Sequence, residues 1–457
     1  MKVAIAPWGD PSPWKKSTYY LEEGGDSQGN RRKTESITSL KLLQEGVDKI
    51  YILVQDSALF TSKKEKEKGG INERAKECGN EVRAYNDLKD HEVIWPRTKF
   101  KDYPDLVERT KMYVECIARR EGIGNAEAIV LPSNIAARFD GVPGLAYTEF
   151  KSDAKNYFIY SVGLLGLYEK LKGEVEKIEE VVVDTTHGIN YFSTLSSNLG
   201  RDFASLVNVL GKGQVKVRYY SSVPMSSKEY TLTEVNKEVS PKLRAIDPQN
   251  LSGRGNSHVY YSLVYNSPLA LIYSLEEYQD YKVGLDSVYS SVSLEGEGGL
   301  KVDYRLRDQV LNKADTTYLN ILAKGLKEKL CKEKCGDWVE FNLLSTLSEE
   351  VYKSVSEASV QLIQHELYVL KKSVEKYCKD NNDITEVPYH KLYISDQEKA
   401  GDEGETGGKA NGNIKRNAIA HAGLLKEFVK VKTEEGCKKI LLSYDDWKKL
   451  KSAVYSR

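Results

Sequence analysis

Residues 415–423, KRNAIAHAG, place an arginine, an asparagine and a histidine within one short, Ala-rich segment. Asn417 and His421 are four residues apart, so on a helix they share a face, and the long side chain of Arg416 can reach around to it. An imidazole moves protons near neutral pH, a guanidinium matches phosphate oxygens, and an amide stabilises developing charge. Together they predict metal-independent RNA cleavage, in which a base assists attack by the 2′-hydroxyl and an acid protonates the leaving 5′-oxygen.

A structural interpretation of the same segment stays open, because a lone histidine on a helix often serves packing and R-x-x-x-x-H arises by chance. One histidine per chain supplies one proton-transfer group, whereas two copies related by a dyad would supply two. Ala418, Ala420 and Ala422 would keep the segment slim enough for two such helices to approach closely. Residues 414–457 carry 11 Lys or Arg against 5 Asp or Glu, a basic flank that would attract an RNA backbone.

A second polar group follows the apolar run EEVVV, in the segment DTTHGIN at 184–190. In open α/β sheets, ligands bind beyond the carboxyl ends of the strands, and the helix that follows offers free N–H groups to an anion. The alternative is that the threonines only cap this helix and the histidine bonds to a neighbouring loop. The candidate ligand-binding residues here are Thr185, Thr186, His187, Gly188 and Asn190.

Polar or aromatic residues also follow the other predicted strands of the first half. Trp8 and Trp14 could each stack on a base, or equally pack in the core. The remaining candidates for ligand binding are Gly9 and Asp10 after the first strand, Asp56 after the second, and Ser133 and Asn134 after the AIVLP run.

The elements that must position these residues differ between the two halves of the chain. VAIAP, KIYILVQ, EVIWP, AEAIVLP and EEVVVD are runs typical of strands buried on both faces, and they alternate with helical segments. This alternation predicts an α/β, Rossmann-like domain with a mainly parallel sheet over residues 1–225. Apolar residues three and four apart then predict an all-α helical bundle over 261–457, after a connector at 226–260. A Gly-rich stretch at 397–413 is expected to be a flexible insert.

Composition indicates an ordinary globular chain of two or three domains, with 457 residues and a formal net charge of +0. Six cysteines are too few for a disulfide scaffold, and the C-x3-C pair Cys331 and Cys335 has no second pair, so we expect no metal. A single disulfide would fit a hyperthermophilic source. MKVAIAPWGD is typical of a strand rather than a signal peptide, and no apolar run approaches bilayer-spanning length, so we expect a cytoplasmic protein without membrane contact.

Standard nucleotide and hydrolase fingerprints are missing from the sequence. No G-x-G-x-x-G follows the first strand, and neither G-x-x-x-x-G-K-[ST], G-x-S-x-G nor H-E-x-x-H occurs. A dinucleotide-dependent dehydrogenase is therefore disfavoured, and a P-loop nucleotide site is excluded.

DTTHGIN at a strand end, followed late in the chain by R-N-x-x-x-H, resembles the CRISPR-associated ribonucleases of type III systems. These proteins join an N-terminal CARF sensor to a C-terminal HEPN nuclease, and the matching residues are Asp184 to Asn190, Arg416, Asn417 and His421. The resemblance implies a homodimer, or an oligomer of dimers, activated by a cyclic oligoadenylate, most often the four-adenylate ring. It also implies cleavage of single-stranded RNA in antiviral defence with no required cofactor, and makes His187 a ligand contact or pocket-forming residue rather than the RNA-cleaving histidine.

Two other functions stay open. The helical half could serve only dimerisation or partner contact, which would make the protein a non-enzymatic sensor or regulator. Alternatively, the N-terminal domain could degrade its own cyclic activator, with His187 or a nearby hydroxyl assisting.

Overall fold

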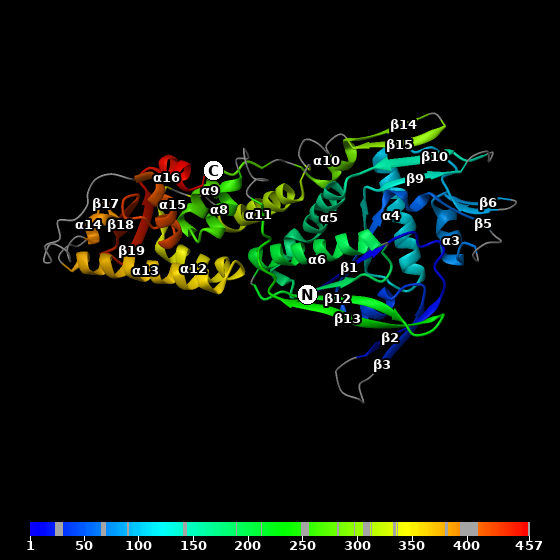
Figure 1. Cartoon of the computed structure of the whole chain (residues 1–457), viewed down its shortest axis with the longest axis horizontal. Coiled ribbons are helices and arrows are strands. Elements are labelled where there is room, and N and C mark those ends of the chain that lie inside the picture. Colours follow the sequence, from blue (N-terminus) through cyan, green and yellow to red (C-terminus); the bar gives the residue numbers. More distant parts are fainter. Residues whose placement is uncertain are drawn as a thin grey trace. The chain divides into compact units, whose positions relative to one another are not determined.

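The computed structural model describes residues 1–22, 31–64, 70–88, 91–139, 144–188, 190–211, 213–247, 256–280, 283–296, 298–304, 311, 313–331, 335, 337–379, 383–393 and 410–455. The chain divides into two compact units, whose elements are labelled in Figure 1. Unit 1 comprises Met1–Val207, Gln214–Pro241 and Lys282–Tyr318, and unit 2 comprises Asn208–Gly213, Lys242–Tyr281 and Leu319–Arg457.

An eight-stranded sheet forms the centre of unit 1, in the order β3-β2-β13-β12-β11-β1-β4-β8. The strands are β1 (Lys2–Trp8), β2 (Ser17–Glu22), β3 (Arg31–Ser36), β4 (Lys49–Gln55), β8 (Ala126–Leu131), β11 (Glu180–Asp184), β12 (Lys216–Pro224) and β13 (Glu229–Val239). From β12 to β8 all neighbours pair in parallel, while β12–β13 and β2–β3 are antiparallel. The predicted α/β, mainly parallel sheet is therefore confirmed for this part of the chain.

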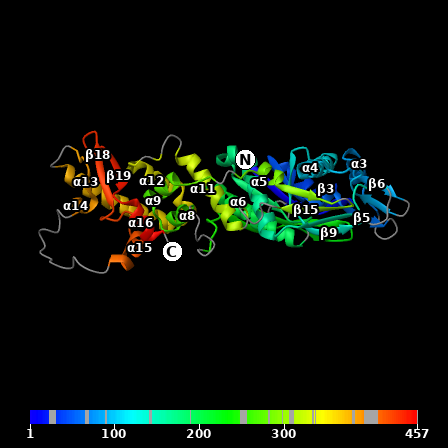
Figure 2. The ribbon, with the colours of Figure 1, turned by 90° about the horizontal axis from the view of Figure 1, so that it is seen from above.

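Helices pack against this sheet because its central strands are apolar on both faces. They are α1 (Leu40–Leu43), α4 (Tyr103–Arg120), α5 (Asn156–Leu171) and α6 (Asn190–Leu210), whereas α3 (Glu73–Glu81) contacts α4 and a smaller sheet, and α10 (Leu285–Ser290) contacts α4 and α5. α5 is buried along most of its length and packs on β8, where Gly166 allows close approach: a Cβ there would lie 2.8 Å from Ile129 Cγ2. α3 and α4 contact each other and lie side by side in Figures 1 and 2.

Two smaller sheets complete unit 1. One has the order β14-β15-β10-β9, from β9 (Asn134–Arg138), β10 (Glu149–Asp153), β14 (Val292–Glu295) and β15 (Gly299–Tyr304). The other has the order β5-β7-β6, from β5 (Thr61–Lys64), β6 (Tyr85–Leu88) and β7 (His91–Ile94). The EVIWP run thus falls in an antiparallel sheet, and its predicted place in a parallel sheet was wrong.

Unit 2 is mainly helical, but it is not the predicted all-α bundle. Its helices are α8 (Ser257–Val264), α9 (Pro268–Glu276), most of α11 (Ala314–Leu330), α12 (Phe341–Glu350), α13 (Glu357–Cys378), α14 (Tyr389–Tyr393), α15 (Ala410–Ala420) and α16 (Trp447–Val454). A sheet of order β16-β19-β18-β17 accompanies them, from β16 (Val339–Glu340), β17 (Val387–Pro388), β18 (Val429–Glu434) and β19 (Lys439–Tyr444). Figure 2 shows β18 and β19 side by side. The period-two pattern VKVKTE, buried at every second residue, explains this strand.

The two units depart from the predicted boundaries in two places. β13 and the first half of α8 lie within the predicted connector at 226–260, and Lys282–Tyr318, predicted as part of the helical domain, belongs to unit 1. Lys282–Tyr318 belongs to unit 1 because β15 pairs in parallel with β10, and the local sequence does not predict this long-range pairing. Residues 410–413 of the predicted Gly-rich insert form the first part of α15, and the rest of that insert lies outside the described residues.

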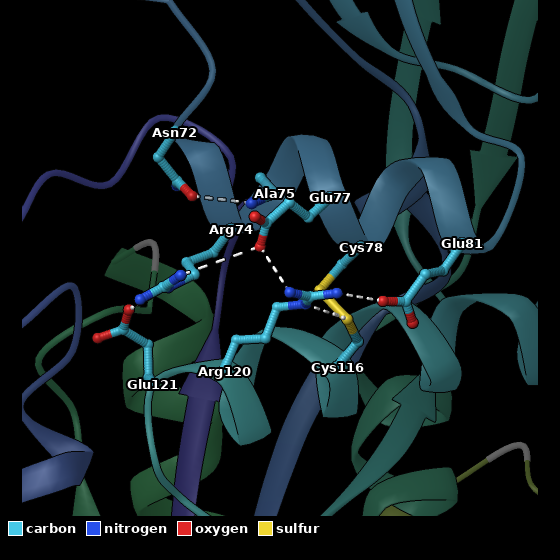
Figure 3. Close-up of a disulfide and its surroundings, with 9 residues drawn as sticks. All are labelled: Asn72, Arg74, Ala75, Glu77, Cys78, Glu81, Cys116, Arg120 and Glu121. Carbon is cyan, nitrogen blue, oxygen red and sulfur yellow. Dashed lines mark hydrogen bonds and ion pairs between the residues drawn. A yellow bond between two sulfur atoms is a disulfide. The ribbon is translucent and has the colours of Figure 1, made fainter.

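All six cysteines form disulfides: Cys78–Cys116, Cys331–Cys335 and Cys378–Cys437. The sequence analysis allowed a single disulfide, and the structure has three, because two of the pairs are brought together by tertiary packing that spacing does not reveal. Figure 3 shows the first pair, which joins α3 to α4. Beside it Arg120 donates to Glu77 at 2.7 Å and to Glu81 at 2.5 Å, so ion pairs reinforce the same helix contact.

Within the described residues, no helix is both long enough and apolar enough to cross a lipid bilayer.

Candidate functional site

The carboxyl ends of β1 and β11 lie next to each other in the middle of the large sheet. From β1 the sheet adds β4 and β8 on one side and β11 and β12 on the other, so its winding reverses between β1 and β11. Such a reversal leaves a crevice in which α/β proteins commonly bind ligands. The fold therefore brings the two groups 8–10 and 185–188 together at this point, as the strand-end argument predicts.

His187 is half-buried where these strand ends meet. Its backbone carbonyl accepts a hydrogen bond from Gly9 N–H at 3.1 Å, and Ser39 N–H donates to its Nε2 at 3.2 Å. The ring centroid lies 4.2 Å from that of Trp14. Because Nε2 accepts, the neutral ring carries its proton on Nδ1, and burial lowers the pKa of His187 to about 3. At neutral pH this imidazole thus offers shape and hydrogen bonds rather than a mobile proton.

Aromatic rings and two unsatisfied donors surround His187. Trp8 packs edge-on against Trp14, with ring centroids 5.2 Å apart, and Tyr19 lies 6.0 Å from the imidazole. The Trp8 indole N–H and the Thr186 hydroxyl are buried with no hydrogen-bond partner among the described residues. Buried donors normally find partners, so a bound ligand or water would complete both.

Other predicted residues of this segment are explained by the fold itself. The Thr185 hydroxyl donates to the Tyr220 carbonyl on β12 at 3.0 Å. A Cβ at Gly188 would lie 2.3 Å from Ser193 Oγ and 3.1 Å from Pro7 Cγ, so close packing already requires glycine there. Asn190 begins α6, and its side chain lies outside what the structure describes.

Asp56 and Ser133 are brought together but both are fully buried. Asp56 accepts hydrogen bonds from Ser133 Oγ at 2.5 Å, Tyr103 Oη at 2.8 Å and Tyr304 Oη at 2.7 Å. Burial raises the pKa of this carboxyl, and the hydroxyl donors offset that effect. The prediction that Asp56 and Ser133 contact a ligand directly gains no geometric support. Their hydrogen bonds instead link the ends of β4 and β8 to α4 and β15.

Asp10 and Asn134 lie at the rim of the strand ends. Asp10 accepts from Thr61 Oγ1 at 2.6 Å and from Ser12 N–H at 2.9 Å. Asn134 is exposed at the start of β9. Neither the hydrogen bonds of Asp10 nor the position of Asn134 excludes a ligand. For both residues ligand binding stays a prediction.

Sequence reasoning missed four residues around the same strand ends: Tyr19, Ser39, Gln55 and Tyr191. Gln55 Nε2 donates to Tyr191 Oη at 2.6 Å, and Tyr191 is 38% exposed. Gln55 ends β4 and Tyr191 is the second residue of α6, so the strand-end rule itself could have found them. Ser39 lies just before α1, and only the fold reveals that it reaches the site. Its hydroxyl also donates to the buried carboxylate of Asp184 at 2.6 Å.

The second site lies at the end of α15, where Arg416, Asn417 and His421 are each exposed. Ala418 and Ala422 are fully buried in unit 2, so their small size serves packing there and not a helix–helix contact between two copies, whereas Ala420 is exposed and its place in such a contact stays a prediction. The helix ends in a left-handed turn at Ala422 (φ 50°) and Gly423 (φ 73°).

The turn after His421 is locked by its neighbours. Tyr444 Oη donates to the Gly423 carbonyl at 3.0 Å, and a Cβ at Gly423 would lie 2.8 Å from Ser267 Cβ. A residue with a side chain would clash there besides being strained at positive φ. The exit of α15, and with it His421, is therefore held in one position.

Asn417 and His421 line one cavity of about 300 Å³, formed with α13, but Arg416 is not among its lining residues. His421 Nδ1 lies 3.3 Å from Glu366 Oε2, and His365 lines the same cavity. The structure thus brings two of the three predicted catalytic residues together and adds α13, which sequence reasoning missed. Among the residues described, no group of three or more His, Cys, Asp or Glu side chains is arranged to hold a metal ion.

Two protein-family models match the chain. The model described as CRISPR system endoribonuclease Csx1, CARF domain, matches residues 3–224, and that of the same protein's HEPN domain matches residues 356–446. The first range contains the strand ends of the large sheet, and the second contains α13 and α15.

Individual relatives are more distant. The CRISPR system endoribonuclease Csx1 of Methanocaldococcus jannaschii is 26% identical over 238 residues, which cover 51% of this chain and 39% of that protein. The match therefore spans less than half the length of this relative. Among solved structures, Enterococcus italicus Csm6 bound to cyclic hexa-2′-fluoro-hexa-dAMP shares 11% identity at a TM-score of 0.23, over 85% of this chain and 69% of that one. A superposition this weak supports no inference about fold or ligand.

Both family models carry the same protein description, and each falls on one of the two candidate sites. The resemblance predicted from DTTHGIN and R-N-x-x-x-H is thereby confirmed. The chain belongs to the CARF–HEPN proteins of CRISPR systems, in the Csx1 family.

Proposed function

We propose that this chain is an endoribonuclease that cleaves single-stranded RNA without a metal ion and is activated by a cyclic oligoadenylate. The observation that carries the proposal is the cavity shared by Asn417 and His421, within the region matched by the HEPN model. The imidazole of His421 is exposed and has the Glu366 carboxylate at its Nδ1. Its Nε2 can therefore accept a proton from a substrate.

In the proposed reaction, the His421 imidazole accepts the proton of a ribose 2′-hydroxyl while that oxygen attacks the adjacent phosphorus. The bond from phosphorus to the 5′-oxygen breaks, and an acid protonates the leaving oxygen, which yields a 2′,3′-cyclic phosphate and a 5′-hydroxyl. Arg416 and Asn417 stabilise the charge on the crowded phosphate. The second proton-transfer group comes from a second copy of the chain in a homodimer.

The proposed activator site is the reversal point between β1 and β11. Trp14 offers a ring on which adenine can stack, whereas Trp8 is only 1% exposed and packs edge-on against Trp14. The unsatisfied donors of Trp8 and Thr186 can bond ligand acceptors. His187 presents a fixed, neutral imidazole to the same ligand. Activation requires that the ring bind the active arrangement more tightly than the resting one. The four-adenylate ring is the preferred candidate.

The test is cleavage of a short single-stranded RNA by the full-length protein, with and without cyclic oligoadenylates of each ring size, in EDTA. We expect cleavage that depends on one ring size and persists in EDTA. Loss of activity in EDTA with rescue by a divalent ion would remove the metal-independent mechanism. No cleavage with any ring would favour a non-enzymatic sensor, and linear product from the ring would indicate that the protein degrades its activator.

A further inference from the structure

We infer that Glu366 on α13 is a positioning residue for His421, an inference that rests on the proposed ribonuclease function. Glu366 Oε2 lies 3.3 Å from His421 Nδ1, although the two residues are 55 positions apart in the chain. The carboxylate is 14% exposed and the imidazole 51% exposed. The pair therefore has a sheltered anion behind a ring whose other edge is open.

Both members of the pair stand on fixed elements. α13 begins at the Ser356 cap, whose side chain accepts from Ser359 N–H, and it packs through a buried stripe. That stripe consists of Ile363, Leu367, Leu370 and Val374. The Cys378–Cys437 disulfide ties the end of α13 to the turn between β18 and β19. Since the turn after His421 is also locked, the distance between the two side chains is set by rigid backbone on both sides.

The chemistry follows from the two distinct ring nitrogens of histidine. A carboxylate on Nδ1 favours the tautomer with its proton there, which leaves the Nε2 lone pair to accept a substrate proton. Once Nε2 is protonated, the same carboxylate stabilises the imidazolium. Within the described part of the chain, Glu366 is the side-chain hydrogen-bond partner of this ring, although His365, Lys426 and Glu427 also line the cavity.

A positioning role differs from a structural one in what it predicts. A histidine–carboxylate pair whose imidazole is half exposed adds little to stability, so its loss should leave folding almost unchanged. Loss of a residue that orients a functional imidazole, by contrast, typically lowers activity by about 10- to 100-fold. We therefore expect Glu366→Gln to lower kcat by about that factor while the KM for RNA stays within about two-fold.

The experiment measures kcat, KM and thermal unfolding of full-length wild-type, Glu366→Gln and Glu366→Asp proteins with saturating cyclic oligoadenylate. Glu366→Asp keeps the charge and should recover part of the lost kcat. Glu375→Gln is the matched control, because it removes the same charge from the same helix and breaks only an exposed pair with Lys372. It should cleave at the wild-type rate.

A wild-type kcat in Glu366→Gln would overturn the inference, as would an equal loss in Glu366→Gln and Glu366→Asp accompanied by a lower unfolding temperature. ¹⁵N NMR of the histidine rings supplies a readout independent of activity: the His421 proton should sit on Nδ1 in the wild type and lose that preference in Glu366→Gln. Protein that cleaves no RNA yet shows this tautomer would defeat the proposed function while keeping the pair. Absence of the Nδ1 tautomer in an active wild type would defeat the pair alone.

Discussion

The two motif histidines of this protein occupy opposite environments. His187 accepts a backbone N–H at Nε2, stacks on Trp14 and is half-buried, and burial lowers its pKa to about 3. His421 has a carboxylate on Nδ1, exposes half of its side chain and faces a cavity. The same residue type is thus fixed as a neutral contact in one unit and left open to exchange protons in the other. The surroundings of a histidine, and not its presence in a motif, decide which chemistry it can perform.

The largest expected effect separates the two histidines by function. His421→Ala should lower RNA cleavage at saturating activator by about 10²- to 10⁴-fold, because it removes the proposed general base. His187→Ala should instead raise the activator concentration needed for half-maximal cleavage. Cleavage rates measured over a series of activator concentrations distinguish the two. Full activity in His421→Ala, or a His187→Ala protein whose only defect is a low rate at saturation, would reverse the comparison.

A second prediction separates packing from ligand approach within the strand-end site. Gly188→Ala should lower the free energy of unfolding by about 1–3 kcal/mol, because its Cβ would overlap Ser193. Gly9→Ala is the matched control: its Cβ would meet only the His187 carbonyl, at 3.4 Å, so the change in stability should stay within about 0.5 kcal/mol. Denaturant unfolding measures both. If Gly9→Ala binds cyclic oligoadenylate as the wild type does, close backbone approach at Gly9 is not needed.

The smallest effect concerns pH. The depressed pKa of His187 means that the unfolded chain binds a proton below about pH 6.5 that the folded protein resists, so stability falls as pH is lowered. Between pH 7 and pH 5 this histidine should lower the free energy of unfolding by up to about 2 kcal/mol. Solvent that reaches the half-buried ring reduces the effect. Thermal unfolding of wild-type and His187→Asn proteins at both pH values measures the difference. An unchanged pH dependence in the variant would show that His187 is not kept neutral by burial.

Several features of the fold and sites could be predicted from local sequence. Continuous apolar runs such as VAIAP indicate strands buried on both faces, which suffices for the parallel part of the large sheet and its strand-end residues. Spacing alone places Asn417 and His421 on one helix face, and the structure has both at one cavity. The alternation in VKVKTE, which indicates a strand in unit 2, was present in the sequence and was overlooked.

Some features were decided only by the tertiary structure, because they are contacts between residues far apart in the chain. The Glu366–His421 pair, the Ser39 N–H on His187, the β10–β15 pairing and the Cys378–Cys437 disulfide all join such segments. Periodicity and motifs report a residue's neighbours along the chain, whereas these contacts depend on how helices and strands pack once their apolar faces are buried. The sequence by itself therefore determined which side chains were available for chemistry, and packing decided which of them are buried, oriented or left open to a substrate.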